Sequence, residues 1–328
     1  MTIDDRADGP IKSQATCCRT PPACGCDLDR VDLRGRRHGL GFLAPLIPAF
    51  DLINNFRVAL AAFTVLLLPG ALIAGDRRLL RPIATLALLQ AGLLLLPLAR
   101  AGDHDSGRTS TLRFLTFNLH VDNNRFDEIA DYVLSSRADI VTLQEVSCAA
   151  AEQLIPKLKP HYPHAFVSAD NCFGIALLTK RPMTMSGQVV VAPRQRPLLV
   201  WARLDWGGTA LAVTTAHPIP PLAPNDQASQ ITRLIMHVAS LTGPQIVAGD
   251  FNLTPFSWGF ARLNNAGLGH QVSYRTTWAP LWVAGWLPPL FTIDNMLTTR
   301  NVVATRVLVG PALGSDHRPV IVDFALAK

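Results

Sequence analysis

An Asp-x-Asn sequence follows one of the apolar runs in the second half of the chain. Residues 245–249 read Gln-Ile-Val-Ala-Gly, Asp250 follows them directly, and Asn252 comes two residues later. Where a buried strand ends in this way, a carboxylate and an amide leave the same side of the chain two residues apart. A pair of this kind is suited to holding a water molecule, a cation or a phosphate.

Polar residues follow or interrupt other apolar segments in the same manner. They are Asn118, Glu145, His217, Asp294, Asp316 and His317. One Asp or His at a strand end is more often a cap or a loop hydrogen bond than a catalyst. Several strand ends that all carry carboxylates, amides or imidazoles are, however, what a hydrolytic site at one edge of a sheet requires.

The elements that would position these residues are mostly strands. Besides the run before Asp250, the pattern predicts strands over 112–118, 140–143, 174–179, 189–192, 198–204, 211–215, 291–297, 302–309 and 319–324. Helical spacing predicts helices around 126–134, with Asn124 as a possible cap, around 231–238, and after Pro255, with Ser257 as the cap. Many strands with few helices between them predict an α/β sandwich of two packed sheets with outer helices.

In chain order, the polar residues resemble the marks of the endonuclease/exonuclease/phosphatase superfamily. Those marks are an Asn after the first strand, Gln-Glu, a Thr-x-His-like element, Gly-Asp-x-Asn, Ile-Asp-x and Ser-Asp-His. The resemblance covers residues 111–326, and the chain departs from the common Ile-Asp-His pattern only at Asn295. It implies a DNase I-like fold, in which two packed mixed β-sheets are flanked by helices in four layers. It also implies hydrolysis of phosphate ester or anhydride bonds.

The resemblance implies a metal site as well. Glu145 matches the principal ligand of a divalent cation, with Asn118 and Asp316 helping around it. Hard carboxylate and amide oxygens suit Mg²⁺ or Mn²⁺, and the lack of a His or Cys cluster argues against structural zinc.

For catalysis, the resemblance implies in-line attack by water without a covalent intermediate. His317 takes the place of the general base, and Asp294 takes the place of the group that orients its imidazole. Asp250 would help to position the water, while Asn252 and His217 would donate to the phosphoryl oxygens as charge develops.

The apolar residues are concentrated before the globular part. Hydrophobic residues make up 49% of the chain and charged residues 16%, a balance that is unusual for a purely soluble enzyme. Residues 58–75 and 83–99 are long and apolar enough to span a membrane, and 39–53 is a weak third candidate, interrupted by Pro45 and Pro48. The chain therefore divides into a disordered Cys- and Arg-rich tail (1–38), a membrane region (39–100), a linker (101–110) and a catalytic domain (111–328).

Basic residues predict the orientation of the membrane region. Arg77, Arg78 and Arg81 lie between the two longer segments, and the positive-inside rule places them in the cytoplasm. Three spans then leave the tail inside and the catalytic domain outside, in a multi-pass protein of the cell membrane. Core helices of a soluble protein are the alternative, whereas a cleavable signal peptide does not fit segments that begin so far from Met1.

The catalytic residues leave the substrate open, because the superfamily includes nucleases, sphingomyelin phosphodiesterases, inositol phosphatases and lipid pyrophosphate hydrolases. The membrane layout and the sequence of 216–221 resemble the bacterial membrane-anchored branch that includes vancomycin-resistance-type (VanJ-like) proteins. That resemblance implies a lipid-linked phosphate or pyrophosphate as substrate and the lipid bilayer as partner. Trp278, Trp282 and Trp286 form either an interfacial loop that reaches lipid or a stripe of core aromatics.

Two other functions stay open. The first is a phosphodiesterase or nuclease that acts on extracytoplasmic nucleic acid or phospholipid headgroups. The net charge of +6 comes partly from the membrane flanks, and no basic track with aromatic platforms stands out, so the sequence argues against nucleic acid as a partner. The second is a membrane-bound binding protein that keeps the fold without the chemistry, against which the full set of catalytic positions argues. No protein partner is predicted.

The six cysteines fall into two groups. Four lie within residues 17–26, in a spacing that matches no standard zinc pattern. Cys148 and Cys172 could form a disulfide in an oxidising compartment, although the sequence does not place their Cα atoms within reach of each other. Arg194 and Arg196 could clamp a phosphate or could simply be solvated.

Overall fold

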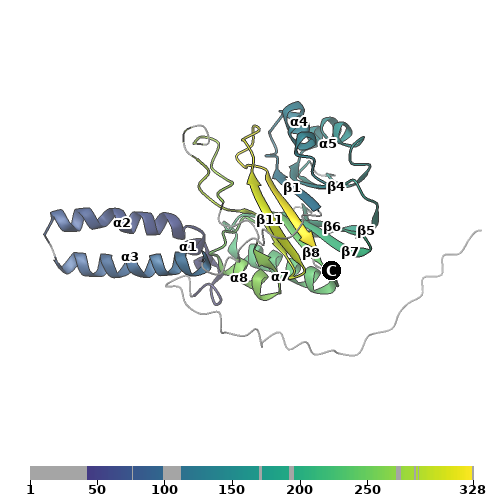
Figure 1. The fold of residues 1–328 in the computed structure, drawn as a ribbon. Coiled ribbons are helices and arrows are strands. Elements are labelled where there is room, and N and C mark those ends of the chain that lie inside the picture. The colour runs from purple at the N-terminus through teal and green to yellow at the C-terminus, as the bar shows by residue number, and fades with distance from the viewer. Residues whose placement is uncertain are drawn as a thin grey trace, which may run out of the picture. The chain divides into compact units, whose positions relative to one another are not determined.

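Figure 1 shows two β-sheets, the helices that flank them and a pair of long helices. This computed structural model describes residues 43–75, 77–98, 112–169, 172–191, 196–270, 275–283, 286 and 288–326. The helices are η3 (Pro48–Phe50), α1 (Asp51–Asn55), α2 (Arg57–Ile73), α3 (Arg77–Leu98), α4 (Phe126–Ser136), α5 (Cys148–Gln153), α6 (Ile155–Leu158), α7 (Pro224–Ser240) and α8 (Trp258–Asn265). The strands are β1 (Leu112–Asn118), β2 (Ile140–Val146), β3 (His164–Ser168), β4 (Gly174–Thr179), β5 (Met183–Val191), β6 (Arg196–Trp206), β7 (Thr209–Ala216), β8 (Gln245–Asp250), β9 (Gly269–His270), β10 (Asp294–Thr298), β11 (Val302–Val309) and β12 (Val320–Leu326).

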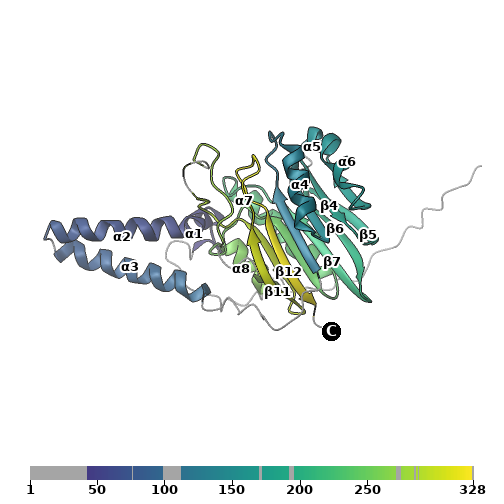
Figure 2. The ribbon, with the colours of Figure 1, turned by 45° about the horizontal axis from the view of Figure 1, so that its top comes forward.

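The strands form two mixed sheets of six strands each. The first sheet has the order β11-β12-β1-β2-β4-β3, and the second has the order β5-β6-β7-β8-β10-β9. Each sheet has one parallel pair near its centre, β1 with β2 and β7 with β8. The remaining neighbours are antiparallel. The strands and their connections can be followed in Figure 2.

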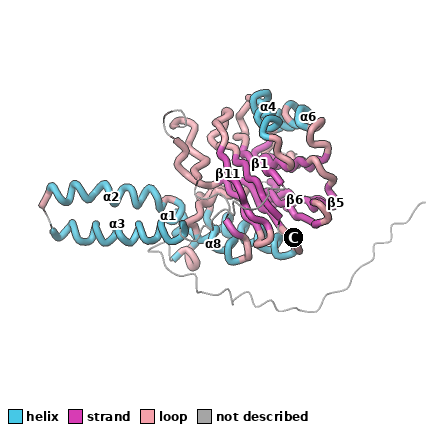
Figure 3. The backbone as a smooth tube through the Cα atoms, in the orientation of Figure 1, coloured by secondary structure: helices cyan, strands magenta, loops and turns pink. Residues whose placement is uncertain are grey.

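Alternation along the strands produces three apolar layers. Phe114 of β1 and Ile246 of β8 pack in the layer between the two sheets. Their chain neighbours point the other way: Leu115 packs under helices α4 to α6, and Val247 packs under α7 and α8. The layers therefore run helix, sheet, sheet, helix. Figure 3 shows the strands lying between the flanking helices. The predicted sandwich of two packed mixed sheets flanked by helices is confirmed.

The topology brings the predicted site residues to one edge of the sandwich. Asn118 closes β1 and Asp250 closes β8. Antiparallel β10 begins at Asp294, directly opposite Asp250, and His317 comes shortly before β12. Gly249 lets β7 and β8 approach closely, because its φ is 137° and a Cβ there would lie 2.1 Å from a backbone oxygen of β7.

Most strands form where the sequence predicts them, and β1, β4 and β11 have the predicted limits. The structure adds β3 and the two-residue β9, and it extends β5 back to Met183. It also adds α5 and α6, which are too short to show a helical period. The strand expected from 291 begins only at Asp294, because the residues before it belong to a loop. Helix α4 follows Arg125 instead of Asn124 and has no side-chain cap. Ser257 caps α8 as predicted, since its Oγ accepts a hydrogen bond from the Phe260 N–H.

Helices α2 and α3 form an apolar hairpin. Gln90 of α3 donates a hydrogen bond of 3.1 Å to Thr64 of α2. Among the described residues, Arg78–Leu95 is long and apolar enough to cross a membrane, whereas Pro48–Asn55 and Arg57–Ile73 meet that test only together, with a bend of 60° between them. Helix α3 begins at Arg77, so the arginines that we expected in a turn lie in its first turns.

The weak candidate over 39–53 does not form a separate spanning helix. Its described part, from residue 43, consists of turns, η3 and the start of α1. Asp51, which we expected at a membrane interface, is buried and bound to the first turn of α8. A carboxylate at a helix N-terminus satisfies backbone N–H groups that have no partner within the helix. The tail (1–38) and the linker (101–110) lie outside the described residues.

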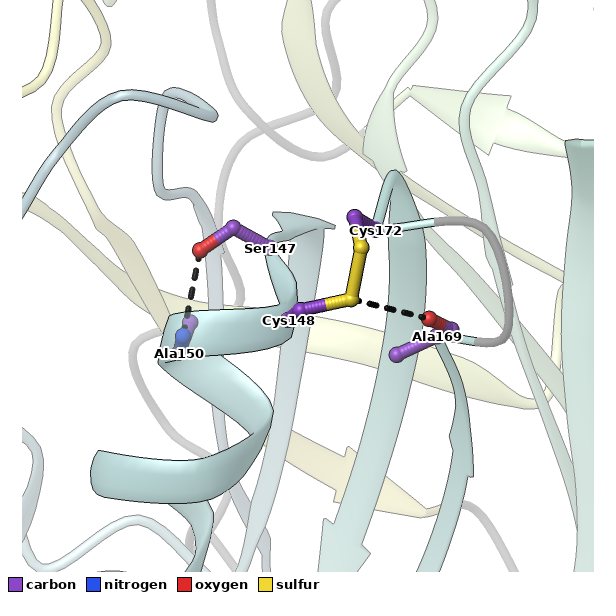
Figure 4. The surroundings of a disulfide bond; sticks show 5 residues. All are labelled: Ser147, Cys148, Ala150, Ala169 and Cys172. Carbon is purple, nitrogen blue, oxygen red and sulfur yellow. Dashed lines mark hydrogen bonds between the residues drawn. A yellow bond between two sulfur atoms is a disulfide. The ribbon is translucent and has the colours of Figure 1, made fainter.

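A disulfide joins Cys148, the first residue of α5, to Cys172, which precedes β4 (Figure 4). The two Cα atoms are 4.5 Å apart. Ser147 caps α5 by accepting a hydrogen bond from the Ala150 N–H, so the end of β2 passes directly into a fixed turn. The pairing that the sequence left open is therefore present, and it ties the end of β2 to the segment that leads into β4.

Candidate active site

His317 and Asp294 form a buried pair where β10 begins and β12 is about to begin. The imidazole Nδ1 lies 2.9 Å and 3.0 Å from the two carboxylate oxygens of Asp294. Their side chains are 5% and 0% exposed, so water does not compete for this contact. With Nδ1 donating to Asp294, Nε2 is the ring nitrogen left to exchange a proton at the site.

Burial and charge act in opposite directions on this pair. Burial alone would lower the pKa of His317, but the carboxylates of Asp294 and Asp250 outweigh it and raise that pKa to about 10. Burial raises the pKa of Asp294, and the charge of His317 offsets only part of this rise. His317 is thus an imidazolium at neutral pH unless another cation approaches the same carboxylates.

Asp250 lies at the centre of the polar cluster. Its Oδ2 accepts a hydrogen bond of 3.0 Å from Asn118, and it lies 3.6 Å from Nε2 of His317 and 3.5 Å from Nε2 of His217. Burial raises the pKa of Asp250, but the two imidazoles and the Asn252 N–H outweigh it, and the net pKa is lowered. A negative charge therefore persists at the centre of the site.

Glu145 is more open than Asp250. Its side chain is 17% exposed, Oε1 accepts a hydrogen bond of 3.1 Å from Asn118, and Oε2 accepts one of 3.0 Å from the Val121 N–H. Its φ is 54°, at an irregularity in the pairing of β2 with β4 between Gln144 and Val146. Because a bulge re-aims a side chain, Glu145 leaves the regular alternation of β2 and turns toward Asn118.

His217 follows β7 and is held by an aromatic wall. The ring of Phe173 stacks on its imidazole, with centroids 5.6 Å apart and an angle of 15° between the planes. The Arg196 guanidinium lies 3.7 Å from the centroid of the same phenyl ring. Nε2 of His217 is 3.7 Å from Oε1 of Glu145. Since Phe173 follows Cys172, the disulfide fixes the base of this wall.

Asp316 lies at the other end of the polar cluster, beside His317. Its Oδ2 accepts a hydrogen bond of 2.8 Å from the indole N–H of Trp278, and its Oδ1 lies 3.9 Å from Nε2 of His317. The structure thus places Asp316 next to the imidazole of His317. Its predicted role as a ligand of the same cation as Glu145 stays a prediction.

Asn252 is turned into the protein. Its backbone N–H donates to Oδ1 of Asp250 at 2.8 Å, and its side-chain nitrogen donates to the Pro218 carbonyl at 2.9 Å. Its φ of 51° is uncommon for a residue with a side chain, although Asn tolerates it better than most. The same nitrogen also lies 3.4 Å from Oδ2 of Asp250. To donate to a phosphoryl oxygen, as predicted, the side-chain amide must give up one of these two contacts.

Ser315 and Phe173 also belong to the site, although neither was among the residues predicted from the sequence. The Ser315 Oγ donates to the Asn118 carbonyl at 2.8 Å and accepts from the His317 N–H at 3.0 Å, which joins β1 to the segment before β12. The Ser-Asp-His motif was the available signal for Ser315. Phe173 carried no signal, because its contact with His217 depends on how the two sheets pack.

The cluster has the chemistry of a divalent cation site. Carboxylates of Glu145 and Asp250 converge on the Asn118 amide nitrogen, and hard carboxylate oxygens suit Mg²⁺ or Mn²⁺. The Oδ1 of Asn118, its predicted ligand atom, accepts a hydrogen bond of 3.0 Å from the His120 N–H. Single ligand atoms of Asp250, Asp294 and His317 also lie within 4.8 Å of one another. In that group Asp294 already binds the imidazole, so the pair is better suited to moving a proton than to holding an ion. The carboxylates of Glu145 and Asp250 fit the cation.

Comparison with known proteins bears on the family and the fold of the chain. The model of the Endonuclease/Exonuclease/phosphatase family matches residues 115–317. No curated protein matches the chain.

Solved structures with the same fold come from bacteria and animals. TDP2 of D. rerio, complexed with a single strand DNA product, superposes with a TM-score of 0.56 at 18% identity, over 65% of this chain and 98% of that one. An endonuclease/exonuclease/phosphatase from Bacteroides vulgatus gives 0.56 at 19% identity, over 67% and 100%. A mutant beta toxin from Staphylococcus aureus with bound magnesium ions gives 0.53 at 16% identity, over 67% and 100%. At these identities the likeness shows the fold.

Proposed function

The chain belongs to the endonuclease/exonuclease/phosphatase family, whose members are metal-dependent phosphoester hydrolases, and we propose that it hydrolyses a phosphate ester or anhydride by direct attack of water. The observation that carries this proposal is the pairing of His317 with Asp294 beside a second, carboxylate-rich group at Glu145. One part supplies a proton acceptor, and the other supplies oxygen ligands for a cation. Direct hydrolysis needs both.

In the proposed reaction, the oxygen of a water molecule bonds to phosphorus as the bond to the leaving oxygen breaks. Nε2 of His317 takes the proton from the water, and Asp294 holds the ring and stabilises the charge that it acquires. Asp250 lies 3.6 Å from the same nitrogen and can hold the attacking water by accepting its second hydrogen. The charged Asp250 is suited to this task because its pKa is lowered.

The phosphoryl group lies on the Glu145 side in this proposal. His217 and Asn252 donate hydrogen bonds to its oxygens as negative charge develops, and the stacked Phe173 keeps the His217 ring in place. A divalent cation bound at Glu145 with Asn118 would polarise the phosphoryl group and, by its charge near Asp250, would favour the neutral form of His317.

We further propose that α2 and α3 are a membrane hairpin of two spans. Large apolar side chains are exposed along both helices, among them Val58, Phe63, Leu66, Ile73, Leu79, Leu88 and Leu95. An apolar surface of this size requires a partner, and lipid suits helices of this length. A hairpin of two spans leaves both of its ends on the same side of the membrane, which agrees with the contact between Asp51 and the catalytic domain.

Two separate features support an extracytoplasmic catalytic domain. The first turns of α3 carry Arg77, Arg78 and Arg81, which favour the cytoplasmic side for the tip of the hairpin. The Cys148–Cys172 disulfide is typical of proteins in oxidising compartments. The residues that carry the two features are independent of each other, yet both favour the same orientation.

The loop that precedes β10 supports a lipid-linked phosphate or pyrophosphate as substrate. Trp282 and Trp286 are 81% and 89% exposed, so they are not part of a core stripe. The base of the loop lies at the site, because Trp278 forms bridges with Phe291 and His317. Exposed tryptophan favours the headgroup level of a bilayer, and a substrate held in that bilayer would reach His317 past this loop.

The full chain, purified in detergent or liposomes with Mg²⁺, tests this proposal. We expect phosphate release from an isoprenyl pyrophosphate, with weaker cleavage of sphingomyelin and of plasmid DNA. Replacing Trp282 and Trp286 by Ser should raise KM for the isoprenyl pyrophosphate and leave hydrolysis of a soluble phosphodiester unchanged. Cleavage of DNA without any release from the lipid would refute the substrate assignment.

A reporter that is active only outside the cytoplasm tests the orientation when fused after Lys328. Activity is expected, and a second fusion at Gly75, in the tip of the hairpin, should be silent. The reverse pattern would place the catalytic domain in the cytoplasm.

A further inference from the structure

A short segment before the first long helix is bound to the catalytic domain. We call Pro48–Arg57, which contains η3, α1 and the first residue of α2, the strap. Both carboxylate oxygens of Asp51 accept hydrogen bonds from α8, at 2.5 Å from the Trp258 N–H and at 2.9 Å from the Gly259 N–H. Oδ1 of Asn55 accepts a third backbone hydrogen bond, of 2.7 Å, from the Thr254 N–H.

These three contacts satisfy donors that have no partner in their own element. The first N–H groups of a helix point out of its end, and here a carboxylate from a distant part of the chain accepts two of them. Asp51 is 8% exposed and also accepts a hydrogen bond of 2.9 Å from Asn54, so its charge is well solvated by the protein. Loss of Asp51 would leave two N–H groups of α8 without an acceptor.

The strap holds the segment that carries two catalytic residues. Thr254, which donates to Asn55, comes two residues after Asn252 and four after Asp250. The segment from β8 to α8 is thus fixed at its start by the second sheet and at its end by the strap. Asn252 sits between these points with a positive φ.

The strap also contacts the loop that precedes β10. The ring of Phe56 meets the ring of Phe291 edge to face, with centroids 5.3 Å apart. Phe291 in turn lies 5.7 Å from Trp278, whose indole donates to Asp316. One segment of ten residues therefore contacts both the segment that follows Asp250 and the loop that contains Phe291.

We propose that the strap is a positioning element of the active site, so that turnover depends on residues that lie outside the family's catalytic domain. The idea rests on the proposed hydrolase function and goes beyond it. Asp51 and Asn55 touch neither substrate nor cation, and they act through the segment that holds Asp250 and Asn252. Because the strap passes into α2 at Arg57, the same contacts fix the site relative to the start of the hairpin.

The test uses the full chain and a soluble reporter, bis(4-nitrophenyl) phosphate, which needs no lipid. We expect Asp51→Ala and Asn55→Ala each to lower kcat per folded molecule by about 10- to 100-fold, since small displacements of catalytic groups have effects of this size. The Mg²⁺ concentration for half-maximal rate should change by a smaller factor than kcat, because Glu145 lies on β2 and is not held by the strap. Asp226→Ala is the matched control, since this exposed carboxylate lies in the first turn of α7.

Hydrogen exchange provides a readout that needs no substrate. In Asp51→Ala, the amides of 254–260 should exchange faster, while those of β1 and β2 keep their protection. Asp51→Asn retains an acceptor oxygen, so it should give a smaller change in both kcat and hydrogen exchange. Unchanged exchange over 254–260, or kcat per folded molecule within two-fold of the parent, would overturn the proposal. An inactive parent chain would refute the hydrolase function instead, and the exchange data would still decide whether the strap holds the segment.

Discussion

The two sides of the catalytic cluster differ in how they are enclosed. The His317 side, made of Asp294 and His317, is closed to solvent and tied together by hydrogen bonds between its own side chains. The Glu145 side, made of Asn118, Glu145 and His217, includes a carboxylate that is 17% exposed and is bordered by an aromatic wall. Asp250 lies between them and contacts both.

This difference suits two separate tasks. A proton acceptor works best when its geometry is fixed and its charge is set by close partners in a dry environment. A Mg²⁺-type ion keeps several waters and is bound by one or two carboxylates, which a partly exposed group such as Glu145 can provide. We therefore propose a separate task for each side, and variants on the two sides should affect different observables.

Replacing the proton acceptor is expected to have the largest effect. His317→Ala should lower kcat by about 10³-fold, within the range that positioned acid–base groups contribute. The Mg²⁺ dependence of the residual rate should stay near that of the parent, because the Glu145 side is untouched. Initial rates against Mg²⁺ concentration measure both quantities, with exposed His161→Ala as the control. A variant that retained full activity would remove His317 from the mechanism.

Asp294→Asn should change the pH profile as well as the rate. Asp294 is one of the charges that raise the pKa of His317 to about 10, so its neutral amide should lower that pKa. A general base works when it is unprotonated, so the rate of the parent should rise as pH passes the pKa of His317. In the variant, the same rise should occur at a lower pH. The plateau should fall by about 100-fold, since the ring loses its orienting partner. An unshifted profile would mean that another group governs the titration.

The same pKa predicts how stability depends on pH in the metal-free protein. The folded pKa of His317, about 10, lies above its ordinary value of 6.5. Its contribution to stability is therefore fully present below pH 6.5 and is lost as pH rises toward 10. In EDTA, the Tm of the parent should fall between pH 6.5 and 10 more steeply than that of His317→Gln. Parallel curves for the two proteins would show that His317 does not gain its proton on folding.

On the open side, Glu145→Gln should act on metal dependence. The amide keeps the shape of the side chain but removes its charge, so the Mg²⁺ concentration for half-maximal rate should rise. Loss of an outer-shell partner lowers metal affinity by ~10- to 100-fold, and loss of a direct ligand should cost at least as much. The pH at which the rate rises should stay close to that of the parent. Glu152→Gln, at an exposed position in α5, is the matched control. If Glu145→Gln instead shifted the pH profile without changing the Mg²⁺ dependence, the division into two sides would be wrong.

The His317 side could be located from the sequence because it depends on strand ends. Asp250 closes a run of apolar residues, and Asp294 and His317 lie in short motifs next to predicted strands. Parallel and antiparallel pairing then carries these ends to one edge, whereas the roles of the residues were implied by the family resemblance and stay predictions. The contact of both Asp294 oxygens with Nδ1, by contrast, required the pairing of β10 with β8.

The surroundings of the site depended on packing between distant segments, and local patterns did not contain them. Glu145 turns out of β2 at an irregularity that exists only because β2 pairs with β4. Residues 39–53 looked like a weak membrane span, because composition does not distinguish a segment buried against a protein from one buried in lipid. Asp51 was the residue that did not fit a span, and its partners on α8 explain why it is there.

The smallest expected effect concerns the wall that borders the open side. Cys172→Ser removes the disulfide, which joins residues 24 apart, and a crosslink of this span typically contributes roughly 3 kcal/mol to stability. The variant should therefore lose Tm, but it should also lower kcat a few-fold, because Phe173 is no longer held against His217. Phe173→Leu separates the two effects, since it removes the stacked ring and leaves the disulfide intact. It should reproduce the loss of kcat with little loss of Tm, and neither variant should shift the pH profile that belongs to His317. A shifted profile in Phe173→Leu would show that the wall acts on both sides, and the cluster would then have to be treated as a single unit.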